Sequence, residues 1–173
     1  NTTTLLNFSK GFLQNGARVV HIYLDSLEEE MAVRMATCWL GVEIEYGTDL
    51  DQIEEMLTVF KDQYKGRFFT KQFPGHSLSA QDVDEFLTNL KSYLYQQDKE
   101  AGLYEDQCGV IDIVVIDYID LMIYDGNVEG FMVDEHKAGE LNAVAIKHKV
   151  GIWTGTQGGT AAMKSDKPKL YEA

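Results

Sequence analysis

The chain has 173 residues, 45% of them apolar, which is the size and composition of one globular domain spanning residues 1–173. No apolar run approaches the roughly 18 residues of a membrane-spanning helix, which excludes a transmembrane protein and a membrane partner. Two cysteines are too few for a disulfide scaffold or a cysteine-based zinc site. With 15 basic and 28 acidic residues, the net charge of −13 disfavours nucleic acid binding except at a local patch or on the inner face of an oligomer.

Helical spacing of apolar residues alternates with β-branched runs through the first half of the chain. Leu5, Phe8 and Phe12 mark the first helical face, which ends at Asn15-Gly16. In chain order the further predicted elements are a strand from Arg18 to Leu24, helices over 27–38 and 50–64, and a strand from Arg67 to Gln72.

The second half continues the same alternation. Ser79 and Asp82 have the spacing of a capping box and predict the start of an amphipathic helix that reaches Leu94. The following elements are a polar loop from Gln97 to Gly109, a strand from Ile111 to Ile116 ended by Asp117, a helix over Phe131–Lys149, a strand from Gly151 to Gln157, and a small, polar, basic tail over Gly158–Ala173.

Strands that alternate with helices predict an α/β fold with a mainly parallel sheet and flanking helices. Ligands of such sheets bind beyond the carboxyl ends of the strands. Asp25, Asp117 and Gln157 follow three of the predicted strands at those ends. The sequence therefore places its candidate functional site at this edge.

Each of the three residues has a functional and a structural interpretation. Asp117 after an apolar strand suits a Walker B carboxylate that holds Mg²⁺ beside nucleotide phosphates, or a structural strand-end acid. Asp25 could be the general base for an attacking water, or could complement the dipole of the next helix. Gln157 could sense a γ-phosphate through its amide, or could be a solvated strand-end residue.

Threonines open the first predicted helix. The hydroxyls of Thr2, Thr3 and Thr4 could cap that helix, or ligate Mg²⁺ beside a phosphate held at the helix N-terminus. A P-loop would require a glycine-rich turn and a lysine immediately before them, whereas the sequence begins at Asn1.

Together these segments resemble the RecA-like ATPase core of DnaB-type replicative DNA helicases, closest to those of tailed phages. The stretches that carry the resemblance are FLQNGARVVHIYLDSLEEEMAVRM, KGRFFTKQFPG, IDIVVIDYIDLM and GIWTGTQGG. The resemblance covers essentially the whole chain and implies a RecA-like P-loop NTPase fold that is incomplete at both ends.

The resemblance also implies roles for individual residues. Asp25 takes the position of the family's catalytic Glu, one methylene shorter, and Arg34 that of its Arg. Asn1 falls where the family has its P-loop Lys, and Thr2 where it has the Mg²⁺-binding hydroxyl. We therefore expect a fragment that lacks the P-loop and the arginine finger and hydrolyses ATP weakly or not at all by itself.

The expected function is part of the motor domain of a hexameric helicase that hydrolyses ATP with Mg²⁺ and translocates on single-stranded DNA in the cytoplasm of a bacterium or of a phage-infected host. Lys164, Lys167 and Lys169 in the tail are candidates for phosphate contacts, with a solvated loop as the alternative. Ring assembly and a primase partner are implied by the resemblance alone. A RecA-type recombinase, another RecA-like ATPase, and a truncated non-catalytic domain that only binds partners are the alternatives.

Overall fold

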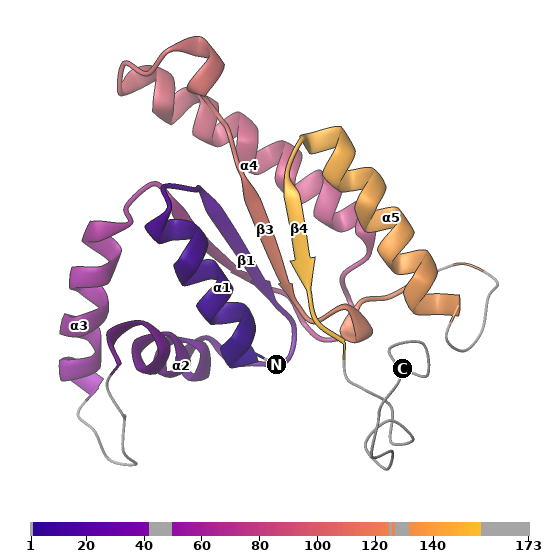
Figure 1. Ribbon diagram of the computed structural model, residues 1–173, viewed down its shortest axis with the longest axis horizontal. Coiled ribbons are helices and arrows are strands. Elements are labelled where there is room, and N and C mark those ends of the chain that lie inside the picture. Colours follow the sequence, from indigo (N-terminus) through magenta and orange to yellow (C-terminus); the bar gives the residue numbers. More distant parts are fainter. Residues whose placement is uncertain (1, 42–49, 125, 127–131, 157–173) are drawn as a thin grey trace.

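The computed structural model describes residues 2–41, 50–124, 126 and 132–156. Its elements alternate between helix and strand (Figure 1). In chain order they are α1 (Thr2–Gln14), β1 (Val19–Tyr23), α2 (Glu28–Leu40), α3 (Leu50–Gln63), β2 (Phe68–Gln72), α4 (Ala80–Glu100), the 3₁₀ turn η1 (Glu105–Gln107), β3 (Ile113–Asp117), the 3₁₀ turn η2 (Ile119–Leu121), α5 (Met132–His148) and β4 (Gly151–Thr154).

The strands form one four-stranded, all-parallel sheet in the order β2-β1-β3-β4. This confirms the predicted α/β class. Parallel strands in this order are buried on both faces, and the apolar runs VVHIY and IVVID meet that requirement. No helix in the described part of the chain is long and apolar enough to cross a membrane.

Helices α1, α2 and α3 cover one face of the sheet, and α4 and α5 cover the other (Figure 1). Alternate side chains of each strand enter the two cores because successive residues of a strand point to opposite faces. The first core contains Leu6, Leu13, Val19, Met31, Trp39, Phe60 and Val115. The second contains Val20, Ile22, Leu87, Val114, Ile116 and Leu141.

The predicted capping box begins α4 as expected. The backbone amide of Asp82 donates to Ser79 Oγ at 3.2 Å, and the Asp82 carboxylate accepts from the Ser79 amide at 2.8 Å. The polar loop predicted to start at Gln97 is wrong at its beginning, because α4 continues to Glu100. Asp98 in this last turn is buried against Arg18, a contact that helical periodicity does not reveal.

Two predicted strand limits also differ from the structure. β3 begins at Ile113 rather than Ile111, and it includes Asp117 instead of ending before it. Ile111 is nevertheless buried in the core, so its hydrophobicity reflects packing outside the strand. β4 ends at Thr154, before the expected end at Gln157, a residue that lies outside the described residues.

Candidate functional site

The carboxyl ends of β1, β3 and β4 lie together at one edge of the sheet. Tyr23, the last residue of β1, is in register with Asp117, the last residue of β3. Beyond the strands, the amide of Leu24 donates to the carbonyl of Asp117 at 3.1 Å, and the amide of Ile119 donates to the carbonyl of Gly155 at 3.2 Å. These backbone hydrogen bonds hold the three strand ends side by side.

Asp117 is the buried acid of this edge, with only 3% of its surface exposed. Burial raises the pKa of its carboxyl above the ordinary value, and repulsion from Asp25 raises it further. A hydrogen bond with the Thr2 side chain and attraction by Arg34 lower the pKa, but burial outweighs them. The Oδ1 atom is buried, and no group of the described residues hydrogen-bonds to it.

An unpartnered buried carboxylate oxygen requires a proton or a cation to offset its lost hydration. Thr2, the first residue of α1, supplies a second oxygen beside it, at the positive end of the helix dipole. A carboxylate and a hydroxyl are hard oxygen donors of the kind that Mg²⁺ prefers, with phosphate and water completing its shell. The residues present at Asp117 and Thr2 therefore fit a magnesium ion.

Asp25 and Arg34 complete the group of charges around Asp117. Asp25 lies in the turn after β1 and is exposed, and Arg34 is exposed on α2. The turn is held by Gln72, whose amide Nε2 donates to the carbonyl of the buried Ser26 at 2.9 Å. Asp25 is thus an accessible carboxylate fixed near the buried one, as the position of a general base requires.

The structure places Thr2, Asp25 and Arg34 within electrostatic or hydrogen-bonding reach of Asp117. Thr3 is exposed on the same first turn of α1. The remaining predicted site residues lie outside the described residues; they are Asn1, Gln157, Lys164, Lys167 and Lys169.

Sequence reasoning missed Lys137, a buried lysine on α5. Its ammonium donates to the carbonyls of Ile119 and Asp120 at 3.4 and 3.3 Å and lies 3.6 Å from the Asp134 carboxylate. These contacts fix η2, the turn that follows the Asp117 strand. A lysine in the polar part of a helix resembles a solvated residue, so no sequence signal would have found it.

In the described residues no group of three or more His, Cys, Asp or Glu side chains could hold a metal ion. A metal at Asp117 therefore depends on hydroxyl, water and phosphate ligands. A cavity of about 490 Å³ between α4 and α5 is lined by residues such as Ala80, Tyr124 and Val144, away from Thr2 and Asp117.

No family model matches the chain, and no curated protein matches its sequence. Its fold is similar to that of a solved DnaB-like replicative helicase, described together with its interactions with primase, at a TM-score of 0.63 and 14% identity. The match covers 97% of this chain and 40% of that one. At this identity the likeness shows the fold alone, and the four-stranded parallel sheet with helices on both faces agrees with the predicted RecA-like architecture.

Proposed function

We propose that the chain forms part of the ATP-driven motor domain of a hexameric replicative DNA helicase. The observation that carries the proposal is the buried Oδ1 of Asp117, which lacks a hydrogen-bond partner among the described residues, beside the Thr2 side chain at the start of α1. The pair lies at the carboxyl edge of the parallel sheet, the edge at which ligands of such sheets bind. Translocation on single-stranded DNA, assembly into a ring and binding to a primase are part of the same proposal.

In the proposed phosphoryl transfer, each residue of the site has a separate role. Thr2 and Asp117 would hold Mg²⁺, which when bound neutralises charge on the nucleotide phosphates. The exposed carboxylate of Asp25 would orient the attacking water and accept its proton. Arg34 limits the pKa rise of Asp117, so it favours the ionised carboxylate that a metal requires.

Residues outside the described part of the chain enter the proposal from the sequence alone. Gln157 would follow β4 and sense the γ-phosphate, and Asn1 would contact the nucleotide just before α1, beside the described residue Thr3. Lys164, Lys167 and Lys169 would contact the phosphates of single-stranded DNA. The proposed location is the cytoplasm of a bacterium or of a phage-infected host.

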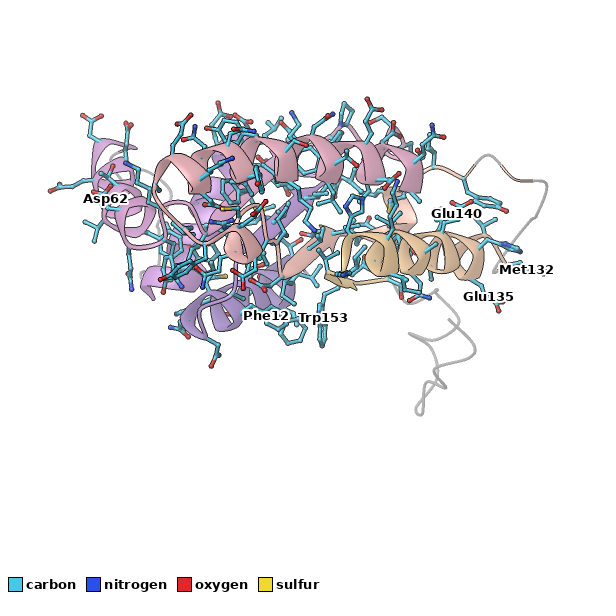
Figure 2. The ribbon with its side chains drawn as sticks, turned by 90° about the horizontal axis from the view of Figure 1, so that it is seen from above. Phe12, Asp62, Met132, Glu135, Glu140 and Trp153 are labelled. Carbon is cyan, nitrogen blue, oxygen red and sulfur yellow. The ribbon has the colours of Figure 1, made fainter. Side chains whose placement is uncertain are left out.

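Calorimetric titration with a non-hydrolysable ATP analogue tests the proposal. Two proteins are compared: the chain of 173 residues, and a version with a glycine-rich, lysine-containing loop joined before Thr2. We expect Mg²⁺-dependent binding to the extended version. The substitution Asp117→Asn should remove the dependence on Mg²⁺, whereas Asp62→Asn, an exposed carboxylate on α3, should leave it unchanged (Figure 2).

Failure of both versions to bind the analogue would reject the nucleotide site and favour a domain that only binds partners. If the extended version binds, electron microscopy with single-stranded DNA distinguishes helicase from recombinase. Closed rings are expected for the helicase. Filaments along the DNA would instead indicate a RecA-type recombinase.

A further inference from the structure

A cavity of about 530 Å³ opens between α4, the residues 108–111 that precede β3, and the end of α5. It lies at the end of the sheet where the strands begin, opposite the edge that holds Asp117 (Figure 1). Its lining includes Lys91, Tyr95, Val110 and Lys149. A cavity of this size fits a small organic ligand.

The lining of this cavity is basic, although the whole chain carries a net charge of −13. None of the described lining residues is an Asp or a Glu, and two of them are lysines, Lys91 and Lys149. Within the ranges that the structure describes, neither ammonium forms an ion pair with a carboxylate. The neighbouring Lys147, by contrast, lies 2.6 Å from the Asp84 carboxylate. The cavity therefore presents two cations to whatever enters it.

The ammonium of Lys91 is fixed at the wall of the cavity. Its Nζ donates to the carbonyl of His148 at 2.6 Å, which uses one of its three N–H groups. Burial lowers the pKa of Lys91 and repulsion by Lys149 lowers it further, whereas attraction by Asp112 raises it. A partly buried ammonium with a second cation beside it gains from an anion that accepts its remaining N–H groups.

Lys149 occupies a backbone position that glycine normally fills. It follows the last turn of α5 with a φ of 55°, in the left-handed region. Its amide donates to the Ile146 carbonyl at 3.3 Å, and the amide of Val150 donates to the Ala145 carbonyl at 3.1 Å, which is the Schellman arrangement of a helix end. Glycine is favoured there because a Cβ is strained in this conformation. A lysine at such a position is a local exception of the kind that functional sites contain.

Packing contacts hold the walls of the cavity in place. Gly109 lies so close to α4 that a Cβ on it would come within 2.7 Å of the Lys91 carbonyl oxygen. The amide of Gly109 donates to the Asp98 carboxylate at 2.9 Å. On the other side, the Nε2 atom of His148 lies 2.6 Å from Oδ1 of Asp84 and joins α5 to α4. A frame that is ordered before binding lowers the entropic cost of binding a ligand.

We propose that this cavity binds a small organic phosphate, with Lys91 and Lys149 contacting the phosphoryl oxygens. Val110, which is 40% exposed, and the half-buried ring of Tyr95 provide apolar surface for the organic part. The ammonium of Lys99 lies 5.8 Å from the centroid of the Tyr95 ring and adds a third cation nearby. The inference is independent of the proposed ATPase function, because the cavity lies at the opposite end of the strands from the candidate functional site.

Charges around the cavity favour a small phosphate over a nucleic acid. Glu105 accepts a hydrogen bond from the Tyr95 hydroxyl at 3.3 Å, at the rim. Asp106 and Asp112 line the next hollow along the same end of the sheet, which shares Val110 with this cavity. A phosphate backbone that continued past the rim would meet these carboxylates and be repelled.

Titration of the full chain with phenyl phosphate, followed by amide chemical shifts in NMR spectra, tests the proposal. We expect saturable shifts of the Lys91, Gly109 and Lys149 amides. Phenol lacks the phosphoryl group and should bind roughly tenfold more weakly or less, because the charge-assisted hydrogen bonds are lost. Inorganic phosphate should shift the same amides at higher concentration, because it lacks the apolar contacts.

Substitutions separate the proposed site from general attraction of anions to lysines. Lys149→Gly removes the ammonium and should weaken phenyl phosphate binding by roughly tenfold or more. It should not lower Tm, because glycine is the favoured residue in the left-handed conformation, so unfolding would not explain the loss. Lys91→Gln should weaken binding to a similar extent. Lys65→Gln removes the same charge from an exposed turn before β2 and should leave the affinity unchanged.

Cys108 provides a second readout, because it lines the cavity. Saturating phenyl phosphate should slow the alkylation of Cys108 by iodoacetamide severalfold, as measured by mass spectrometry. Cys38 lies on α2, away from the cavity, and its alkylation rate serves as the internal reference.

Three results would overturn the proposal. The first is the absence of saturable shifts at Lys91 and Lys149, including the case in which phenyl phosphate shifts only the Thr2 and Leu24 amides at the opposite edge of the sheet. The second is an affinity for phenyl phosphate that is the same in Lys149→Gly as in the unsubstituted chain. The third is a single-stranded oligonucleotide that shifts the Lys91 and Lys149 amides at a lower phosphate concentration than phenyl phosphate does, which would assign the cavity to nucleic acid.

Discussion

Replacing Asp117 by Asn should stabilise the fold while removing the proposed metal ligand. Burial makes the ionised carboxyl of Asp117 unfavourable, and no group in the described part of the chain hydrogen-bonds its Oδ1 to compensate for lost hydration. Asparagine has nearly the same shape, carries no charge, and keeps an oxygen for the Thr2 hydroxyl. Either side chain leaves a polar atom without a partner among the described residues at this position, but asparagine removes the charge that burial disfavours. A shift of one pKa unit corresponds to about 1.4 kcal/mol, so we expect a gain of about 1 kcal/mol at pH 7. For a chain of this size, Tm would rise by about 3 °C.

The gain should depend on pH in a defined direction. The folded pKa of Asp117 lies above its ordinary value of 3.8, so folding disfavours the ionised form. At neutral pH that penalty is fully present and the substitution relieves it. As the pH falls through the folded pKa toward 3.8, the carboxyl is protonated in both states and the advantage of asparagine disappears.

Urea unfolding of both proteins at pH 7 and at pH 3.5 measures these differences. Asp62→Asn is the matched control, because it removes the same charge from an exposed position on α3. Equal stabilisation by Asp62→Asn would attribute the effect to relief of the net charge of −13. A loss of stability at pH 7 in Asp117→Asn would contradict the prediction, since it would mean that the ionised carboxylate is well compensated without a ligand.

Three further predictions concern the stability of the fold that holds the site. His21 is fully buried, and its Nδ1 is hydrogen-bonded with Ser9 Oγ at 2.9 Å. Burial lowers its pKa to about 4, so the unfolded chain takes up a proton at a higher pH than the folded chain does. The free energy of unfolding should therefore drop by about 2 kcal/mol between pH 7.5 and pH 5. In urea titrations, the double variant Ser9→Ala/His21→Leu should show a flatter pH dependence; an identical slope would contradict this origin. Asp98→Asn should lower the free energy of unfolding by about 3 kcal/mol in urea titrations, because it leaves the guanidinium of Arg18 without the carboxylate that it contacts at 2.7 and 2.8 Å. A loss below about 1 kcal/mol would show that water replaces the ion pair. Ser79→Ala should cost about 1 kcal/mol by thermal unfolding, and no change would mean that α4 does not need its cap.

The sequence was most informative where local patterns repeat many times. Alternating apolar runs and helical faces indicated the α/β class, and Ser79 with Asp82 indicated the start of α4. The placement of Asp25 and Asp117 at one edge also followed, because parallel strands end on the same side of a sheet. The catalytic and metal roles of these residues remain predictions.

Other features depend on contacts between residues far apart in the chain. Hydrophobic periodicity and capping act over a few neighbours, so the sequence indicates the type, the order and the approximate position of each strand and helix. The order β2-β1-β3-β4, the extension of α4 through the Arg18–Asp98 pair, and the contact of Lys137 with the turn after Asp117 come from tertiary packing. Tertiary packing also buries one oxygen of Asp117 without a hydrogen bond to any described residue, because burial depends on every segment that packs around a group and not on its neighbours in sequence.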